Sequence, residues 1–423
     1  LGLRPHVGRP QPNRPDSHFR GYRAAVATSR GPARWAYRAY RSLPGPVRSV
    51  GETVLRRRAE GETRALTPFP DEPTRLLIGP LNTAGQAHRW ATAANLLPGV
   101  AAKSLNVERR STGVTYGYET DWFLSQAAQL RGLRPYQEAV LDLTHVLVES
   151  GRAILDQPLD RTTVDDIPRL REHGVAVAML LHGSEMRDLH RHAETYPHSP
   201  FRQEWDERWH RMQATVERTR AVVEQFDGPV FVPTHDMLDF VPGASLLPIV
   251  VDVDRFAVGP GDGGVAVLER ERPVVLHAPT NPRLKGTDAV ERVLHRLEGE
   301  GLVTYRRLQG VPNQEMPSFL ADADIVIDQI VLGNAATLTA EATAAGRLVL
   351  GHLSPTVRER MTAFDPDGQA PPVVEADPDT LEDVLRQILG DRSTYQELAA
   401  RGPAWSRRNH GNCPAAAALT HFL

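Results

Sequence analysis

Short apolar runs that end in a loop and are followed by an amphipathic stretch recur along this chain, and this pattern constrains its fold more than any other feature. A short apolar run bounded by turn residues is typical of a buried strand, and the stretches between the runs have the period of a helix. The alternation predicts an α/β fold with parallel, doubly wound sheets, whose ligands bind beyond the carboxyl ends of the strands. The predicted strands are residues 75–79, 100–102, 145–148, 175–181, 229–232, 245–248, 274–277, 302–306, 325–328 and 347–350.

The length and the loop-forming residues divide the chain into two units of this kind. A chain of 423 residues is long for a single core. The run GPGDGG at 259–264 separates the two sets of strands. We therefore predict a first Rossmann-like domain at 71–254 and a second at 255–402. A basic extension at 1–70 precedes them, and an Ala-rich helix within 403–423 is predicted to cross back to the first domain.

Charge is unevenly distributed, although the formal net charge is only −3. Residues 1–70 contain 14 arginines and four acidic residues, so this extension is strongly basic. An arm of this kind lies on an anionic membrane surface or forms a solvated extension, and the sequence leaves both alternatives open. Nucleic acid is not the expected partner, because the rest of the chain is acidic.

The cysteine count and the hydropathy pattern bear on the compartment. Cys413 is the one cysteine, so the chain has neither an internal disulfide nor a CxxC-type metal site. No apolar run reaches the length of about 18 residues that spans a membrane, and the N-terminus lacks the apolar core of a signal peptide. We therefore expect a cytoplasmic protein, either free or peripheral on the inner face of the membrane.

Lysine is almost absent from the chain, since 47 of the 49 basic residues are arginines and the lysines are Lys103 and Lys285. A compact ammonium and a planar guanidinium do different work, so a lysine in such a chain is informative. Lys285 and Arg283 lie in the loop after the strand at 274–277, directly before a glycine and an amphipathic helix. A strand end, a basic loop and a helix start together are typical of a site for phosphate oxygens.

His182 is a further candidate, because it lies at the carboxyl end of the predicted strand at 175–181. The alternative is that this segment only begins a helix, with Ser184 as its N-cap. The second glycine of a nucleophile elbow is missing here, so a serine hydrolase is not predicted.

Histidine and aspartate pairs elsewhere do not predict a metal site. On a helix, His190 and His192 point about 200° apart, and we expect both to be solvated. Asp252 and Asp254 lie beside the linker between the domains rather than between a strand and a phosphate loop. The motifs of dinucleotide and P-loop sites are also absent. No metal and no other cofactor is therefore predicted.

Four segments of the second domain are informative in their order, namely LPIVVDVDRF (247–256), LHAPTNPRLKGTD (276–288), GVPNQEMPSFLADADIVIDQ (310–329) and AEATAAGRLVL (340–350). In these segments the chain from about Arg75 to its end resembles the GT-B glycosyltransferases, in particular the retaining, nucleotide-sugar-dependent family GT4. The first domain is similar to that family only in its opening glycine loop and in the strand end at His182.

The resemblance implies two Rossmann-like domains that face each other across a cleft and bind a nucleotide sugar. Arg283 and Lys285 would hold the donor diphosphate, which is electrostatic stabilisation of the leaving group without a metal. Glu341 would accept hydrogen bonds from the ribose hydroxyls. The remaining implied roles are base contacts by Gln309, Gly310 and Val311, a close backbone approach to the phosphates at Gly85, and contacts to the sugar by His182 and Asp328.

At one position the chain departs from the family pattern. The family often has a second glutamate eight residues before the position of Glu341, where it contacts the transferred sugar, and this chain has Gly333 there. Sugar recognition would then depend on Asn334 or on backbone N–H groups near Ala335, at the start of the following helix.

The function implied is therefore transfer of a hexose from a nucleotide sugar to an acceptor, without a metal and with retention of anomeric configuration. The sequence does not specify the nucleotide, the sugar or the acceptor. Three alternatives stay open: a non-catalytic GT-B subunit that binds a nucleotide sugar, a membrane-associated scaffold, and a nucleotide-sugar epimerase.

Overall fold

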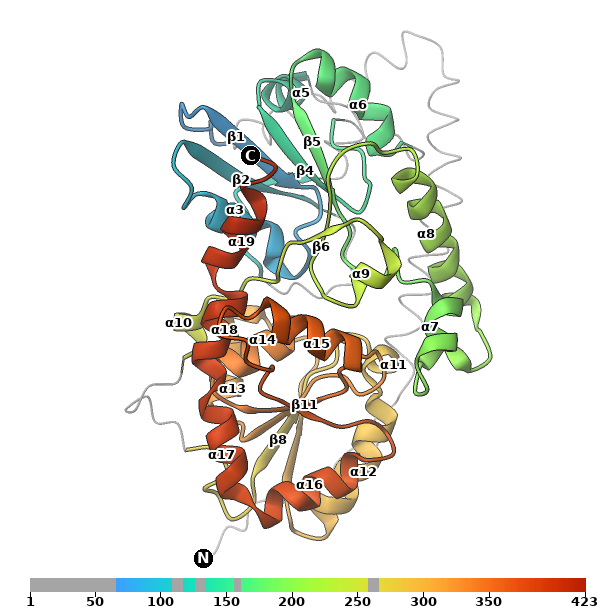
Figure 1. The fold of residues 1–423 in the computed structure, drawn as a ribbon, viewed down its shortest axis with the longest axis vertical. Helices are drawn as coiled ribbons and strands as arrows, with labels where there is room; N and C mark the ends of the chain where they lie inside the picture. The colour runs from blue at the N-terminus through green and yellow to red at the C-terminus, as the bar shows by residue number, and fades with distance from the viewer. Residues whose placement is uncertain (1–65, 109–116, 126–133, 156–160, 258–265) are drawn as a thin grey trace, which may run out of the picture.

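The computed structural model describes residues 66–108, 117–125, 134–155, 161–257 and 266–423. Most of the basic extension and the glycine run at 259–264 therefore lie outside the described residues. The described part forms two units, one above the other in Figure 1, and each is built on a parallel sheet. This confirms the predicted α/β, doubly wound fold.

The first unit has a seven-stranded sheet in the order β3-β2-β1-β4-β5-β6-β7. Every neighbouring pair of strands in it is parallel. Its strands are β1 (Thr74–Gly79), β2 (Val100–Glu108), β3 (Trp122–Ser125), β4 (His145–Glu149), β5 (Ala176–Leu180), β6 (Val230–Val232) and β7 (Ser245–Leu246). Its helices are η1 (Thr83–Gly85), α3 (Gln86–Ala94), α5 (Arg134–Leu141), α6 (Thr163–Glu172), α7 (Leu189–Thr195), η2 (Pro200–Arg202), α8 (Glu207–Val223) and α9 (Met237–Phe240).

The second unit has a five-stranded sheet in the order β12-β11-β10-β8-β9, which is also parallel throughout. Its strands are β8 (Val274–His277), β9 (Thr304–Arg307), β10 (Ile325–Ile327), β11 (Leu348–Gly351) and β12 (Val373–Glu375). The remaining helices are α10 (Val253–Phe256), α11 (Pro282–Lys285), α12 (Thr287–Gly299), η3 (Asn313–Glu315), α13 (Met316–Ala321), α14 (Thr337–Ala344), α15 (Pro355–Phe364), α16 (Leu381–Gly390), α17 (Arg392–Ala400), α18 (Gly402–His410) and α19 (Asn412–Leu419).

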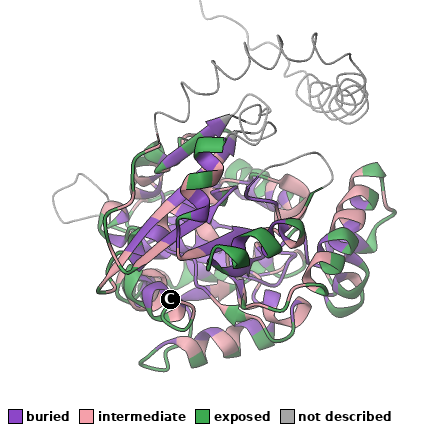
Figure 2. Cartoon of the chain, turned by 90° about the horizontal axis from the view of Figure 1, so that it is seen from above, coloured by how far each residue is buried: buried purple, intermediate pink, exposed green. Residues whose placement is uncertain are grey.

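The apolar pattern of the sequence accounts for these elements. Every residue of β8, β10 and β11 is buried, as expected for central strands with helices on both faces. Helix α12 buries Val290, Leu294 and Leu297, whose spacing places them on one face. In Figure 2 the strands are mostly buried and the helices show exposed outer faces. Two strands at sheet edges, β3 and β12, were not predicted; Phe123 of β3 and Glu375 of β12 are exposed, so neither strand is a fully buried apolar run.

The chain crosses between the two units twice. The first crossing leads from β7 into α10, and the second leads from α18 of the second unit into α19. Ala415 and Leu419 of α19 are buried in the same apolar cluster as Trp90 of α3, and Figure 1 shows α19 beside α3. The last helix therefore packs on the first unit.

A long segment of the first unit packs against the second unit. Leu189, Phe201 and Trp209, which lie on α7, η2 and α8, are buried in one apolar cluster with Val275 and Ile330 of the second unit. In Figure 1, α7 lies at the level of α11. The two units therefore share part of their core along this side.

The structure corrects the expectation about the environment of His192. We expected this histidine to be solvated, but its side chain is fully buried. Its Nε2 donates to the Leu332 carbonyl oxygen at 3.2 Å, and its Nδ1 lies 2.7 Å from Ser199 Oγ. Burial lowers the pKa of His192 to about 4, so the ring is neutral at pH 7.

None of the described helices is both long enough and apolar enough to cross a membrane.

Buried and partly buried histidines are expected to make the fold sensitive to acid. Burial lowers the pKa values of His192, His235, His277 and His410 to about 4. Between pH 6.5 and pH 4 the unfolded chain therefore binds protons that the folded protein does not bind, so the free energy of unfolding decreases as the pH falls through this range. We predict that, between pH 7.5 and pH 5, the free energy of urea unfolding of His235→Gln decreases by about 2 kcal/mol less than that of the wild type. His295→Gln, a change at an exposed histidine, is the control, and equal losses in all three proteins would contradict the prediction.

Candidate functional site

A cavity of about 200 Å³ lies at the carboxyl ends of β8 and β9, where the second unit faces the glycine loop of the first. Ala84 and Tyr118 line it from the first unit. From the second unit it is lined by Ala278, Pro279, Thr280, Lys285, Leu308, Gln309, Gly310, Val311, Asn313, Met316, Ala336, Thr337, Leu338 and Glu341. Five of the predicted donor-site residues therefore line one cavity, namely Lys285, Gln309, Gly310, Val311 and Glu341.

Lys285 is held in place by a buried carboxylate. Its Nζ donates a short hydrogen bond to Asp328 Oδ1, and Asp328 is almost fully buried directly after β10. Thr339 Oγ1 donates to the other oxygen, Asp328 Oδ2, at 2.8 Å. Both oxygens of Asp328 are therefore used within the protein, and the contact with Oδ1 positions Lys285 at the cavity wall.

Glu341 is buried in α14, and none of the cationic side chains that the structure describes forms an ion pair with it. Its Oε1 accepts a hydrogen bond from Asn313 Nδ2 at 2.9 Å. Burial raises the pKa of Glu341 to about 7, although the Asn313 hydrogen bond and the charges of Arg89 and Arg255 act in the opposite direction. A carboxylate in this state has free acceptor capacity at the cavity wall, and hydroxyl groups of a ligand can use it.

The glycine loop of the first unit brings its backbone close to the cavity. Gly85 has a φ of 72°, and a Cβ atom there would lie 2.8 Å from Tyr118 Cδ1. Gly85 and Tyr118 line a second, adjoining cavity, while the neighbouring Ala84 lines the first. The loop is therefore shaped for close approach at a position where a larger side chain would not fit.

His182 lies at the end of β5, as expected, in contact with two carboxylates. Its Nε2 donates to Glu149 Oε1 at 2.8 Å, and Glu149 is fully buried at the end of β4. Its backbone N–H donates to Glu185 Oε1 at 2.7 Å. Burial alone would lower the pKa of His182, but the hydrogen bond to Glu149 and the charges of Glu149 and Glu185 raise it.

Glu149 is the residue that the sequence analysis missed. Its second oxygen accepts hydrogen bonds from the backbone N–H groups of Leu81 and Asn82 at 2.7 and 2.8 Å. One carboxylate thus joins the histidine at the end of β5 to the loop after β1. The signal was present in the sequence, because a glutamate directly after the apolar run of β4 lies at the carboxyl edge of the sheet.

Arg283 is held away from the cavity. Its Nη1 donates to Asp206 Oδ2 at 2.7 Å, and its guanidinium carbon lies 4.2 Å from the centre of the Trp209 ring. Both partners belong to the start of α8 in the first unit. In this arrangement Arg283 connects the two units, so its predicted contact with a diphosphate would require that these contacts break.

The loop after β10 is packed against the first unit. Gly333 has a φ of 73°, and a Cβ atom there would lie 2.6 Å from Tyr196 Cε1, so Tyr196 covers the position where a longer side chain would project. Asn334 Nδ2 lies 3.4 Å from Asp236 Oδ1, and Asp236 forms a buried ion pair with Arg187. These residues and Ala335 do not belong to the lining of the first cavity.

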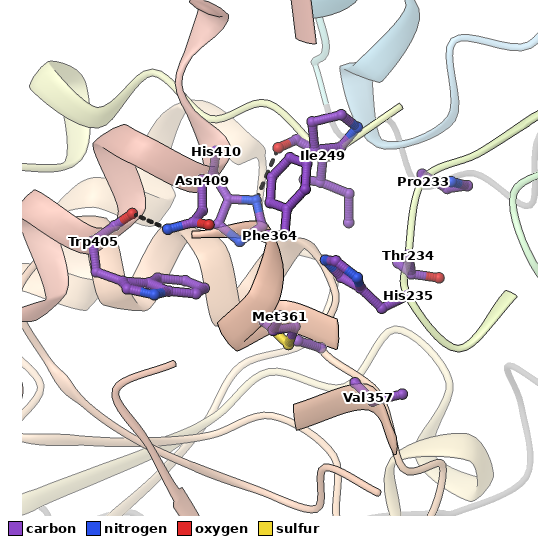
Figure 3. A pocket seen from close by; sticks show the side chains of 12 residues that line it. Pro233, Thr234, His235, Ile249, Val357, Met361, Phe364, Trp405, Asn409 and His410 are labelled. Atoms are coloured by element: carbon purple, nitrogen blue, oxygen red, sulfur yellow. Dashed lines mark hydrogen bonds between the residues drawn. The ribbon is translucent and has the colours of Figure 1, made fainter. Parts of the chain in front are cut away.

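Ala335 lines a different, very small cavity at the second crossing, shown in Figure 3. Its volume of about 10 Å³ is that of roughly one water molecule. His410 Nδ1 lies 3.0 Å from the Ile249 carbonyl oxygen, and Asn409 Nδ2 donates to the Trp405 carbonyl oxygen at 2.9 Å. The cavity therefore belongs to the packing of the crossing helix and is too small for a substrate.

Within the described ranges, one group of side chains has metal-ligand spacing. His198 Nε2 lies 3.5 Å from Asp377 Oδ2 and 3.8 Å from Asp379 Oδ2. The backbone N–H groups of Asp379 and Thr380 donate to Asp377 Oδ1, which accounts for part of the group as a local turn. These three residues do not line the first cavity. Asp254 is paired with Arg407 and Asp252 caps α10, so they form no common ligand set.

The contact between Glu149 and His182 predicts a measurable change in the pKa of the histidine. Glu149→Gln keeps the shape of the side chain but removes the charge, so we expect the pKa of His182 to fall. The measurement is an NMR titration of histidine side chains, with the His182 signal assigned from His182→Asn. Glu138→Gln, on the exposed surface of α5, is the matched control. An unchanged pKa of His182 in Glu149→Gln would show that the contact does not set it.

Comparison with known proteins supplies the name of the architecture. No protein-family model and no curated protein sequence matches this chain. Among solved structures, sucrose-phosphate synthase from Thermosynechococcus elongatus superposes with a TM-score of 0.53 at 12% identity, over 82% of this chain and 97% of that one. HepE from Anabaena, solved with UDP and glucose, gives a TM-score of 0.50 at 10% identity, over 82% and 98% of the two chains.

A third similar structure is an alpha-glucosyltransferase solved with UDP and a 13-mer DNA containing an HMU base. It has a TM-score of 0.50 at 10% identity and covers 80% of this chain and 95% of that one. At such identities the comparison bears on the fold. The two parallel sheets, the facing carboxyl edges and the returning last helix all agree with it, and the chain has the GT-B fold of these glycosyltransferases.

Proposed function

We propose that this protein transfers a hexose from a nucleotide sugar to an acceptor hydroxyl, without a metal and with retention of anomeric configuration. The observation that carries the proposal is that Lys285, Glu341 and the 308–311 loop line one cavity. The presence of UDP in two of the similar structures supports a nucleotide donor. The retaining outcome and the absence of a metal are inferred from the resemblance in sequence.

The geometry suggests how the donor would be bound. The backbone of residues 309–311 would contact the base, and Glu341 would accept hydrogen bonds from the ribose hydroxyls. Lys285 would contact the diphosphate, together with the N–H groups at the start of α14, which line the same cavity. When the bond between the anomeric carbon and the diphosphate breaks, negative charge grows on the leaving oxygen, and the fixed ammonium of Lys285 stabilises it.

His182 would act on the sugar side of the site. Its Nε2 is occupied by Glu149, and the neighbouring carboxylates raise its pKa, so the ring keeps a positive charge to a higher pH than a free histidine. The ring would hydrogen-bond a sugar hydroxyl through Nδ1, and its positive charge would act on the departing diphosphate. As the new bond to the anomeric carbon forms and the bond to the diphosphate breaks, the acceptor hydroxyl would pass its proton to the departing diphosphate oxygen, which leaves the glycosylated acceptor and the nucleoside diphosphate.

A second candidate is a protein that binds the nucleotide but does not transfer the sugar. It is favoured by the contact between Gly333 and Tyr196, which fills the space beside the loop where the sugar would be recognised. Incubation of the protein with a labelled nucleotide sugar in a single turnover separates the two, because only the transferase releases nucleoside diphosphate. Thermal-shift measurements with UDP-, GDP- and ADP-sugars come first and identify the donor, since a ligand that binds only the folded protein raises its Tm.

The role of Lys285 can be tested with variants that separate an effect on nucleotide binding from an effect on stability. Lys285→Ala leaves the buried Asp328 without its cation and is expected to cost about 3 kcal/mol of stability. The double variant Lys285→Ala/Asp328→Asn removes both charges and should recover much of that loss. Both variants are expected to bind UDP, or whichever nucleoside diphosphate the screen identifies, at least about tenfold more weakly than the wild type. Wild-type affinity in the double variant, measured by calorimetry, would exclude Lys285 from the diphosphate site.

The raised pKa of Glu341 predicts that stability and nucleotide affinity both depend on pH, in opposite directions. Its pKa is raised from 4.5 to about 7 in the folded protein, so its contribution to stability is present below pH 4.5 and is lost as the pH rises through 7. Glu341→Gln should therefore gain stability over the wild type at pH 8 but not at pH 4.5. Nucleotide affinity of the wild type should fall as the pH falls below 7, because the protonated carboxyl group is a poorer acceptor for ribose hydroxyls. A wild-type affinity that is constant from pH 8 to pH 6 would contradict this role.

A further inference from the structure

A second cavity, of about 380 Å³, adjoins the proposed nucleotide cavity at the crossings between the two units. Tyr118 and Asn313 line both cavities, so the two are neighbours. Asp252 lines the second cavity from the first crossing and Asn412 lines it from the other. Its volume lies in the range of small-molecule sites, and it is too large to be filled by a single inorganic anion.

Arg89, on α3, is the most informative residue in this cavity. It is partly buried and lines the cavity, yet it makes no hydrogen bond and no ion pair with any residue that the structure describes. Burial lowers the pKa of Arg89, and the charges of Glu341, Asp252 and Glu119 only partly oppose this shift. A guanidinium in this situation loses hydration without gaining a hydrogen-bonded anion, and binding of an anion would offset that cost.

Arg255 places a second guanidinium on the same cavity. Its Nη1 donates to Asn313 Oδ1 at 3.1 Å and its Nη2 donates to the Asn313 carbonyl oxygen at 2.7 Å. Both acceptors are neutral, so these contacts fix the side chain without neutralising its charge. Two guanidinium groups, one from each unit, therefore face one cavity, and both can donate hydrogen bonds to an acidic group of a ligand.

The rest of the lining favours hydroxyl groups on the same ligand. Asp252 and Glu119 offer carboxylate acceptors, while Gln314 and Asn412 offer amide groups that both donate and accept. Polar groups of both kinds around a cationic centre are the partners of a polyol that carries one acidic group. A purely apolar ligand would leave these groups without hydrogen bonds.

We propose that this crossing cavity binds a small polyhydroxylated anion, a polyol that carries a phosphate or carboxylate group, with Arg89 as its principal ionic contact. The proposal goes beyond the proposed glycosyl transfer, because the cavity lies beside the nucleotide site and is lined by other charged residues. It does not depend on whether the protein transfers a sugar.

The two cavities are connected through hydrogen bonds. Arg255 donates to Asn313, and Asn313 Nδ2 donates to Glu341 Oε1 at 2.9 Å. An anion bound to Arg89 and Arg255 would draw these guanidinium groups away from Glu341. It would thereby change the electrostatic surroundings of the carboxylate that accepts hydrogen bonds from the nucleotide. By thermodynamic reciprocity, the anion would change nucleotide affinity by the same factor by which the nucleotide changes anion affinity.

Calorimetric titration of the full chain tests the proposal, at constant ionic strength set with sodium chloride. The probes are glycerol 3-phosphate, glycerate, inorganic phosphate and glycerol. We expect saturable binding of glycerol 3-phosphate or glycerate, weaker binding of inorganic phosphate and no binding of glycerol. The tighter of the two organic anions identifies the acidic group. Arg89→Gln should lose about tenfold or more in affinity for that anion.

Two further variants keep the test decisive. Arg89→Lys retains the charge and should retain part of the binding, which separates loss of the ionic contact from damage to the fold. Arg134→Gln removes an equal charge from the exposed surface of α5 and should bind like the wild type. Two results overturn the proposal: no saturable binding of any anion to the wild type, or equal binding by the wild type and Arg89→Gln. Loss of anion binding in Lys285→Ala/Asp328→Asn but not in Arg89→Gln would also overturn it, because the anion would then occupy the nucleotide cavity.

Discussion

The arrangement of this protein depends on the burial of apolar side chains from α7, η2 and α8 in the core of the second unit. Trp209 is fully buried there, and its ring provides the surface on which Arg283 stacks. The same packing brings Tyr196 against Gly333 and His192 against the Leu332 carbonyl oxygen. Apolar burial is not directional, but it brings these polar groups within reach of one another, and their hydrogen bonds then fix one relative position of the two units. The shape of the site between the sheets follows from that position.

The sequence predicted those parts of the fold and of the site that are determined locally. The central strands β8, β10 and β11 were recognised because parallel strands that are buried on both faces read as continuous apolar runs. Lys285 and Glu341 were placed at one edge of a sheet because each follows a strand end within a few residues or lies on the next helix. The structure brings both to the wall of one cavity. The α/β class follows from the order of such elements, whereas the GT-B fold was implied by the resemblance of four segments of the second domain to a known family.

The sequence did not predict the contacts of a residue whose partner is distant in the chain. Nothing near Arg283 indicates that Asp206 and Trp209 hold it, because they precede it by more than seventy residues. Gly333 was interpreted as a missing carboxylate, whereas the structure shows that the space beside it is filled by Tyr196. Glu149 was overlooked because its partners, the His182 ring and the N–H groups of Leu81 and Asn82, follow two other strands, which only the folded sheet brings beside the end of β4.

Two buried carboxylates of the second unit, Asp328 and Glu341, differ in how their charges are compensated. The difference distinguishes a carboxylate that holds another side chain in place from one that is available to a ligand. Asp328 has a cation and a hydroxyl group in contact, so its charge is compensated within the protein and its oxygens are occupied. Among the described residues, Glu341 has one amide as its hydrogen-bond partner, and the charges of Arg89 and Arg255 act on it only through space. Burial without a cation in contact is unfavourable for the free protein, and a fold gains nothing from it. Glu341 therefore has hydrogen-bond acceptors that a ligand would occupy. The same argument applies to the hydrogen-bond donors of Arg89, on the other side of Asn313.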